Sequence, residues 1–294
     1  MPGFEATHAV ITRLWLEVAR EQRRTARAAD LASHYEKLAK ENPVALRDLR
    51  QRMATLHRRT AERHRTSAEL QALHATRLAA WIDENSVERQ PEFATSVGAA
   101  LGDASIVLTL VSTDDQVALS TASDGDATVA RDAEFVSGEG PITDAVRTCA
   151  AVTAADEVLS TRWPHYAPSV RRAGVRAVLA VPLRQPISCV GALCLLRRGP
   201  TISPALATAT NRVADALART VLLPSSPFPD DDPLRLFVES SYQDVVHQAA
   251  GMLSVRHRCS PDDAVALLRA RAFTEGIAVD RLARRVLRGE VSFD

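Results

Sequence analysis

Four arginines near the end of the chain have a spacing that suits phosphate binding. In the segment 279–288, apolar residues recur at i, i+3, i+4, i+7 and i+8, which predicts a helix with one apolar stripe. The arginines are spaced so that they share the opposite face. Guanidinium groups pair with phosphate oxygens, so this face could bind a nucleic acid, although a solvated face near a helix C-terminus is the plain alternative. The four residues are Arg281, Arg284, Arg285 and Arg288.

A second set of candidate contact residues lies in a helix predicted around 245–253. Helical spacing leaves Gln248 and Gly251 on one face, beside His247 and Ala250. Glycine inside a helix costs about 1 kcal/mol relative to alanine, and it is tolerated best where another helix or a nucleotide must approach. The expected core stripe of this helix is Val245, Val246, Ala249, Met252 and Leu253.

Between these two segments, the sequence predicts another helix that begins at Ser260. Pro261 suits its first position and Asp263 its third, which forms a capping box. The residues expected to face inward are Ala264, Leu267, Leu268 and Ala272.

Together, these residues resemble the ANTAR family of RNA-binding antitermination modules. The match covers about 242–289 and rests on Gln248–Ala249, Gly251–Met252–Leu253, Ser260, Asp263–Ala264, Leu267–Leu268–Arg269, Ala272 and Leu282–Ala283. The resemblance implies that Gln248, Ala249, Ala250 and Gly251 face RNA, and that Arg269 contacts phosphate with the four arginines above. The family often has Lys at the position of Ala250, so that contact is either replaced by the arginines or absent.

The middle of the chain, about 85–222, changes to the period of strands. β-Branched runs predict strands at 105–113, 117–121, 175–181 and 190–196, with a turn at 113–115. Helices are expected near 91–101, 140–149 and 163–173, and from 203 to 222. This pattern predicts an α+β domain with an antiparallel sheet and flanking helices.

The order of five short motifs in this region resembles the GAF family of sensor domains. The motifs are Gly138–Glu139–Gly140–Pro141, Arg162–Trp163–Pro164, Gly174–Val175–Arg176–Ala177, Val181–Pro182–Leu183 and Gly191–Ala192–Leu193. The resemblance implies a ligand site between sheet and loops, with Glu139, Trp163, His165 and Tyr166 as candidates. Core packing is the favoured alternative for Trp163 and Tyr166. Since His165 has no second ligand, no metal and no cofactor are predicted.

Residues 4–82 read as two long helices with one break at 41–43. Asn42 can cap the second helix and Pro43 suits its first position. The expected coiled-coil seam is Leu46, Leu49, Met53 and Leu56. Helices of this length need a partner, either each other or a second chain, so we expect a helical dimerisation arm and a homodimer.

The composition adds three constraints. Basic and acidic residues number 36 each, so net charge indicates no partner, and no apolar run predicts a membrane span. The cysteines have no C-x-x-C spacing, which favours a reduced, cytoplasmic protein. Some GAF-like domains reduce methionine sulfoxide with cysteines, and Cys149, Cys189 and Cys194 are the candidates here. Cys189 and Cys194 are five residues apart and so point to opposite faces of one strand, and we expect no enzyme.

We therefore expect an arm at 1–84, a GAF sensor domain at 85–222, a linker at 223–233 and an RNA-binding ANTAR module at 234–294. The resemblance implies that this module stabilises paired stem-loops in nascent mRNA, so that the terminator hairpin does not form. A small molecule, a redox change or a protein partner would supply the signal. The alternative is a ligand- or redox-sensing scaffold whose C-terminal helices bind a protein.

Overall fold

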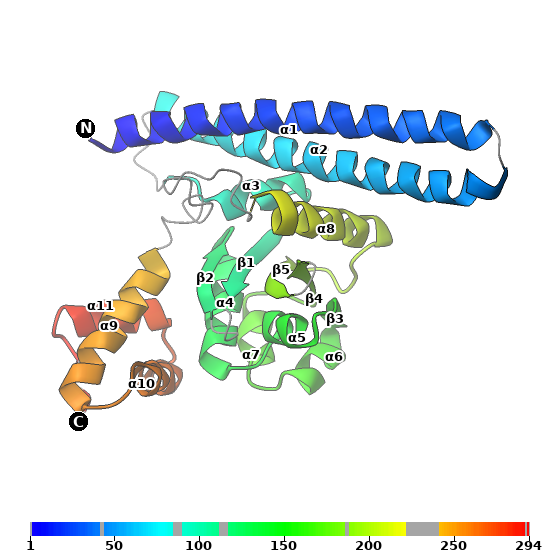
Figure 1. Cartoon of the computed structure of the whole chain (residues 1–294). Coiled ribbons are helices and arrows are strands. Elements are labelled where there is room, and N and C mark those ends of the chain that lie inside the picture. The colour runs from blue at the N-terminus through cyan, green and yellow to red at the C-terminus, as the bar shows by residue number, and fades with distance from the viewer. Residues whose placement is uncertain are drawn as a thin grey trace. The chain divides into compact units, whose positions relative to one another are not determined.

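The computed structural model describes residues 2–41, 44–84, 90–111, 117–185, 188–221, 241–291 and 293. The chain divides into two compact units. The first contains residues 1–91 and 211–231, and the second contains residues 92–210 and 232–294. The predicted α+β class is confirmed: a long helical arm, a central antiparallel sheet and a C-terminal group of helices are all present (Figure 1).

The arm is a helical hairpin. Helix α1 (Pro2–Lys40) packs along helix α2 (Arg47–Asp83), and a short 3-10 turn (Val44–Leu46) precedes α2 (Figure 1). Alanines recur every seven residues at buried positions of α2, and small side chains let two helix axes approach closely. These alanines are Ala54, Ala61, Ala68 and Ala75. The carboxylate of Glu21 in α1 is also buried, and it meets His64 Nδ1 and Arg24 Nη1, each at 2.6 Å.

The leucines of the predicted coiled-coil seam do not pack between α1 and α2, so the first of the two partners that the sequence left open does not cover them. Leu49 and Leu56 are 50% and 54% exposed, and Leu46 is exposed as well. The alanine face lies beside the leucine face on α2, and it is buried because it allows the closer helix approach. An apolar stripe is thus left on the surface of this unit. The expected cap at Asn42 and Pro43 lies outside the described residues.

The second unit contains a sheet of five strands within the described part of the chain. Their order is β2-β1-β5-β4-β3, and every neighbouring pair is antiparallel. Gly191 in β5 faces β1 so closely that a Cβ atom would lie 2.0 Å from the Thr109 carbonyl oxygen. The strands are β1 (Ser105–Val111), β2 (Val117–Ala122), β3 (Val152–Ala155), β4 (Ala177–Arg184) and β5 (Cys189–Arg197).

The four predicted strands are confirmed, and β3 is an addition too short for its period to be read from the sequence. The expected turn at 113–115 and the expected linker at 223–233 lie outside the described residues.

Four helices pack their apolar faces on one side of this sheet. The shared core includes Ala130, Ala145, Leu159 and Val170 from the helices and Val178 from β4. The helices are α4 (Gly125–Ser137), α5 (Pro141–Thr148), α6 (Asp156–Arg162) and α7 (Ala167–Arg172). The second unit also contains α3 (Phe93–Ala100) and the start of α8 (Pro204–Ala216). The end of α8 and a π-helical turn (Leu217–Val221) belong to the first unit.

The C-terminal module consists of the three predicted helices, α9 (Ser241–His257), α10 (Pro261–Glu275) and α11 (Val279–Leu287). The capping box of α10 is present: Ser260 Oγ accepts from the Asp263 N–H at 3.1 Å, and Asp263 Oδ2 accepts from the Ser260 N–H at 3.3 Å. The chain leaves α10 through Gly276 in the left-handed conformation. Over the described residues, no helix is long and apolar enough to cross a bilayer.

Candidate nucleic-acid interface

Helix α11 has the two faces that the sequence predicts. Val279, Leu282, Ala283 and Val286 are buried in the core of the module. The arginines therefore lie toward solvent: Arg281, Arg284 and Arg288 are exposed, and Arg285 is partly exposed.

Most of these arginines have carboxylate partners at the surface. Arg284 lies 3.8 Å from Asp280, Arg285 lies 2.8 Å from Glu275, and Arg288 lies 2.6 Å from Glu290. Hydrogen bonds from Arg271, and then from Arg285, hold the pKa of the Glu275 carboxyl below its ordinary value. Water screens such exposed pairs, so a phosphate can replace the carboxylate at little cost. The described residues include no carboxylate paired with Arg281.

Helix α9 presents Gln248 and Gly251 on its exposed side, as expected. A Cβ atom at Gly251 would meet nothing within 4 Å, so packing inside the module does not require glycine there. Two apolar side chains share this surface: Met252 is 49% exposed and Val255 is 82% exposed.

The buried stripe of α9 is rotated from the predicted one. It follows positions 246, 249, 250 and 253, so Ala250 lies in the core and Met252 does not. The side chains of Ala249 and Ala250 are both buried, which does not fit their expected place on the RNA-facing surface. The physical reason is that α9 packs against both α10 and α11, and their positions decide which arc of the helix is covered. Leu267 in α10 is also more exposed than expected.

Arg269 differs from the other candidate arginines because a neighbouring helix covers it. Its guanidinium lies 4.0 Å from the centroid of the Phe135 ring in α4. Phe135 and Val136 both pack against the core of the C-terminal module. The guanidinium of Arg269, which the sequence assigns to phosphate binding, therefore packs against the sheet domain.

The four candidate ligand residues of the sheet domain lie close together, but two of them fill the interior. Trp163 and Tyr166 are buried in the core with their rings edge to face, 6.0 Å apart. The Glu139 carboxylate accepts hydrogen bonds from the backbone N–H groups of His165, at 2.5 Å, and Tyr166, at 3.3 Å. The burial of the two rings fits the core-packing alternative, whereas His165 is exposed.

Glu134 is a buried carboxyl that sequence reasoning missed. One of its oxygens accepts a hydrogen bond from the Thr143 N–H at 2.6 Å, and burial raises the pKa of Glu134 to about 7. The side chain occupies the space beside Gly140, where a Cβ atom would lie 2.4 Å from Glu134 Cδ. The sequence predicts that a glutamate inside an amphipathic helix lies on the surface. The one sequence feature that pointed to a buried side chain here was Gly140, whose missing Cβ leaves room for it.

The fold also pairs two cysteines that are distant in the sequence. Partial burial raises the pKa of Cys189, and the nearby Cys149 thiol at the end of α5 acts in the same direction. Cys189 Sγ donates to the Gly191 carbonyl oxygen at 3.2 Å. Cys194 is fully buried, and burial raises the pKa of its thiol. Among the residues with described positions, no group of three or more His, Cys, Asp or Glu side chains could hold a metal ion.

The described residues thus contain an antiparallel sheet with helices on one face and a three-helix module with a row of surface arginines. Comparisons with known families agree with this organisation. The GAF domain model matches residues 70–221 and the ANTAR domain model matches residues 239–287. The chain belongs to the GAF domain family and carries an ANTAR domain at its C-terminal end, so both resemblances stated from the sequence are confirmed.

No curated protein matches the chain. Among solved structures, the GAF domain region of a protein from Geobacter sulfurreducens PCA is similar, with 20% sequence identity and a TM-score of 0.29. That alignment covers 38% of this chain and 80% of the other. GAF and ANTAR are regulatory domains, the first a sensor and the second associated with RNA-binding antitermination.

Proposed function

We propose that this protein is an RNA-binding transcription antitermination regulator whose GAF domain and helical arm control its ANTAR module. The observation that carries the proposal is the row of arginines on α11, turned outward by a buried apolar stripe, in a module that matches the ANTAR family. Cations on a rigid helix bind the RNA backbone, and unpaired loop bases supply the specific contacts.

In the proposed complex, the module binds paired stem-loops in nascent mRNA and stabilises that RNA conformer against the terminator hairpin. Gln248 contacts a loop base, and Gly251 allows the RNA to approach the α9 backbone. Arg281, Arg284, Arg285 and Arg288 neutralise phosphates. No covalent chemistry is needed, because a difference in affinity between two RNA conformers is sufficient.

The contact of Arg269 with Phe135 supports control by the GAF domain. While its guanidinium lies against Phe135, Arg269 is only partly exposed, so an RNA phosphate has less access to it than to the arginines on the surface of α11. Docking of α10 on α4 therefore competes with RNA, and a signal that weakens docking increases RNA affinity.

The exposed leucine stripe supports the proposal that the arm forms a homodimer. Leu46, Leu49 and Leu56 lie outside the seam of the hairpin, and a second copy would bury them. Two ANTAR modules in one dimer would bind the two loops of a paired target.

The test is RNA affinity of charge-reversed protein. The full chain is titrated into a labelled RNA with two adjacent stem-loops, and fluorescence anisotropy is measured at several salt concentrations. We expect the double variant Arg281→Glu, Arg284→Glu to bind at least about tenfold more weakly and with a shallower salt dependence. The control is Arg147→Glu, an exposed arginine of α5. Equal binding by the unmodified protein and the double variant would contradict the proposal.

A protein partner for the C-terminal helices is the second candidate, and the exposed Met252 and Val255 favour it. An apolar surface on α9 suits a helix of another protein as well as the stacking of a base. Steep salt dependence of RNA binding would argue against this candidate. Crosslinking to cellular RNA would also argue against it if twin hairpins upstream of terminators were enriched.

A further inference from the structure

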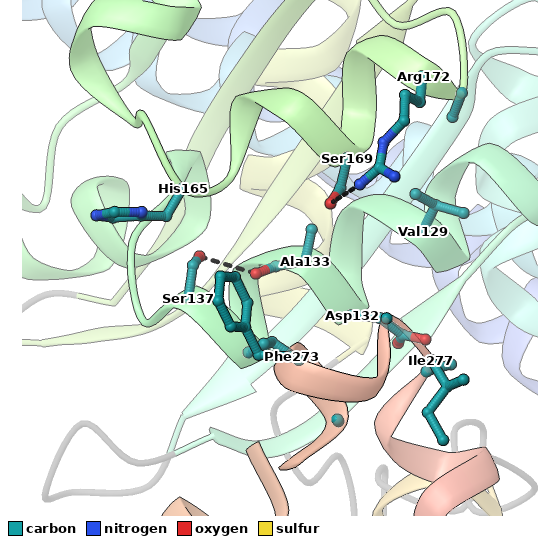
Figure 2. Close-up of a pocket in the computed structure, with 14 residues that line it drawn as sticks. Val129, Asp132, Ala133, Ser137, His165, Ser169, Arg172, Phe273 and Ile277 are labelled. Atoms are coloured by element: carbon teal, nitrogen blue, oxygen red, sulfur yellow. Dashed lines mark hydrogen bonds between the residues drawn. The ribbon is translucent and has the colours of Figure 1, made fainter. Parts of the chain in front are cut away.

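A cavity of about 510 Å³ lies where α4 and α7 of the GAF domain meet the end of α10. Its size falls within the range of small-molecule sites in proteins. The residues that line it come from both domains, among them Arg172, Ser169 and His165 on the GAF side and Phe273 and Ile277 on the ANTAR side (Figure 2). It is separate from the interior occupied by Trp163 and Tyr166.

The cavity offers one cation that is available to a ligand. Arg172 is exposed, and no carboxylate within the described ranges pairs with it. Its Nε donates to the Pro168 carbonyl oxygen at 3.2 Å, and Nη2 donates to Ser169 Oγ at 3.4 Å. A guanidinium has five N–H donors, so further donors remain for the two oxygens of an anion.

Besides the polar Ser137, His165 and Ser169, the rest of the wall is apolar or negative. Phe273 is 64% exposed, and Val129, Val136 and Ile277 also line the space. Asp132 lies on a different side of the cavity from Arg172 (Figure 2), and its carboxylate is paired with Arg131 at 3.0 Å. A second negative group near Asp132 would be repelled, so the site suits a ligand with one anionic group and an apolar body.

We propose that this cavity binds a small aromatic organic anion, with its carboxylate or sulfonate on Arg172 and its ring against Phe273 and Ile277. Such a ligand touches α7 and α10 together, so it binds the docked arrangement more tightly than an undocked one. It therefore holds Arg269 against Phe135 and lowers RNA affinity, and RNA lowers the affinity for the ligand by the same factor. The effect on RNA rests on the proposed function, whereas ligand binding does not.

The first experiment titrates 1-anilinonaphthalene-8-sulfonate into the full chain and follows its fluorescence, with 2-naphthoate as competitor. We expect one saturable site that Arg172→Gln weakens about tenfold, since a charge-assisted hydrogen bond is lost. Phe273→Ser weakens the same site. Arg171→Gln, a neighbouring exposed arginine that bonds to Ser160 outside the cavity, leaves it unchanged. Circular dichroism checks that each variant is folded.

The proposed site would be overturned if the unmodified protein, Arg172→Gln and Phe273→Ser bound the sulfonate with equal affinity. It would also be overturned if 2-naphthoate displaced none of the sulfonate. The second experiment measures RNA affinity by anisotropy with and without saturating 2-naphthoate, and weaker RNA binding is expected. Ligand binding that depends on Arg172 but leaves RNA affinity unchanged would support the site and overturn the coupling. Ligand binding by a chain that binds no RNA would overturn the proposed function and leave the site standing.

Discussion

The guanidinium of Arg269 in α10 lies 4.0 Å from the centroid of the Phe135 ring in α4. The contact joins a residue of the ANTAR domain to a residue of the GAF domain, and both side chains are partly buried there. A cation over an aromatic ring contributes about 0.5–2 kcal/mol, with the larger values where water is excluded. The contact is therefore strong enough to bias docking and weak enough to be reversed by a ligand or by RNA.

Removing the ring should increase RNA affinity. In Phe135→Ala, Arg269 loses its stacking partner and α10 loses apolar contact with α4, so the module is docked for less of the time. We expect RNA to bind about 3- to 10-fold more tightly in the anisotropy assay. Val158→Ala, an exposed apolar residue of α6, is the control and should not change binding. Unchanged affinity in Phe135→Ala would show that docking does not compete with RNA.

The substitution Gly251→Ala should stabilise the fold but weaken RNA binding. The position is inside a helix and a Cβ atom there meets open space, so alanine should raise the free energy of unfolding by about 0.5–1 kcal/mol. If RNA approaches this backbone, the same methyl group should weaken RNA binding. Urea unfolding and anisotropy on one preparation measure both quantities. The control is Gly125→Ala on α4, where an added Cβ atom also meets nothing within 4 Å. If Gly251→Ala stabilises the protein and leaves RNA affinity unchanged, Gly251 is not part of the interface.

The stability of the protein should fall as pH rises from about 4.5 to about 7. Burial raises the pKa of Glu134 to about 7 from an ordinary value of 4.5, and the nearby Asp144 acts in the same direction, while hydrogen bonds from Thr143 oppose the shift. The folded protein therefore binds more protons than the unfolded chain in this window. The stabilisation is complete below pH 4.5 and is lost as pH rises through 7, a total on the order of 3 kcal/mol.

The measurement is urea unfolding at several pH values for the unmodified protein and Glu134→Gln. Glutamine can still accept the hydrogen bond from Thr143 but does not titrate, so the dependence on pH should flatten. Glu157→Gln, at an exposed position of α6, should leave the dependence as it is. Parallel pH profiles for Glu134→Gln and the unmodified protein would mean that another group is responsible.

Charge on the leucine stripe of the arm should abolish self-association. We expect the unmodified protein to have the mass of a dimer in multi-angle light scattering. The double variant Leu49→Glu, Leu56→Glu should have the mass of a monomer, because two copies cannot bury four carboxylates in an apolar contact. Thr55→Glu, an exposed neighbour on α2, should remain a dimer. A monomeric unmodified protein, or a dimer that survives both glutamates, would contradict this assignment of the stripe.

The sequence by itself determined the features that depend on one segment at a time. The 3.6-residue period places the arginines of α11 opposite its apolar stripe, and this holds whatever the helix packs against. The capping box at Ser260 and Asp263 is likewise local, since both hydrogen bonds join residues three apart. The β-branched runs identified four of the five strands in the described part of the chain for the same reason.

Only the tertiary structure decided which of several apolar or polar positions are covered. Whether Ala250 or Met252 is buried depends on where α10 and α11 lie around α9. Whether the alanines or the leucines of α2 pack against α1 depends on how closely the two helices approach. Whether the Arg269 guanidinium is exposed to solvent depends on Phe135, which lies 134 residues earlier in the chain. Periodicity gives the direction of a side chain on its own helix, but burial requires a second surface, and residues distant in the sequence supply it.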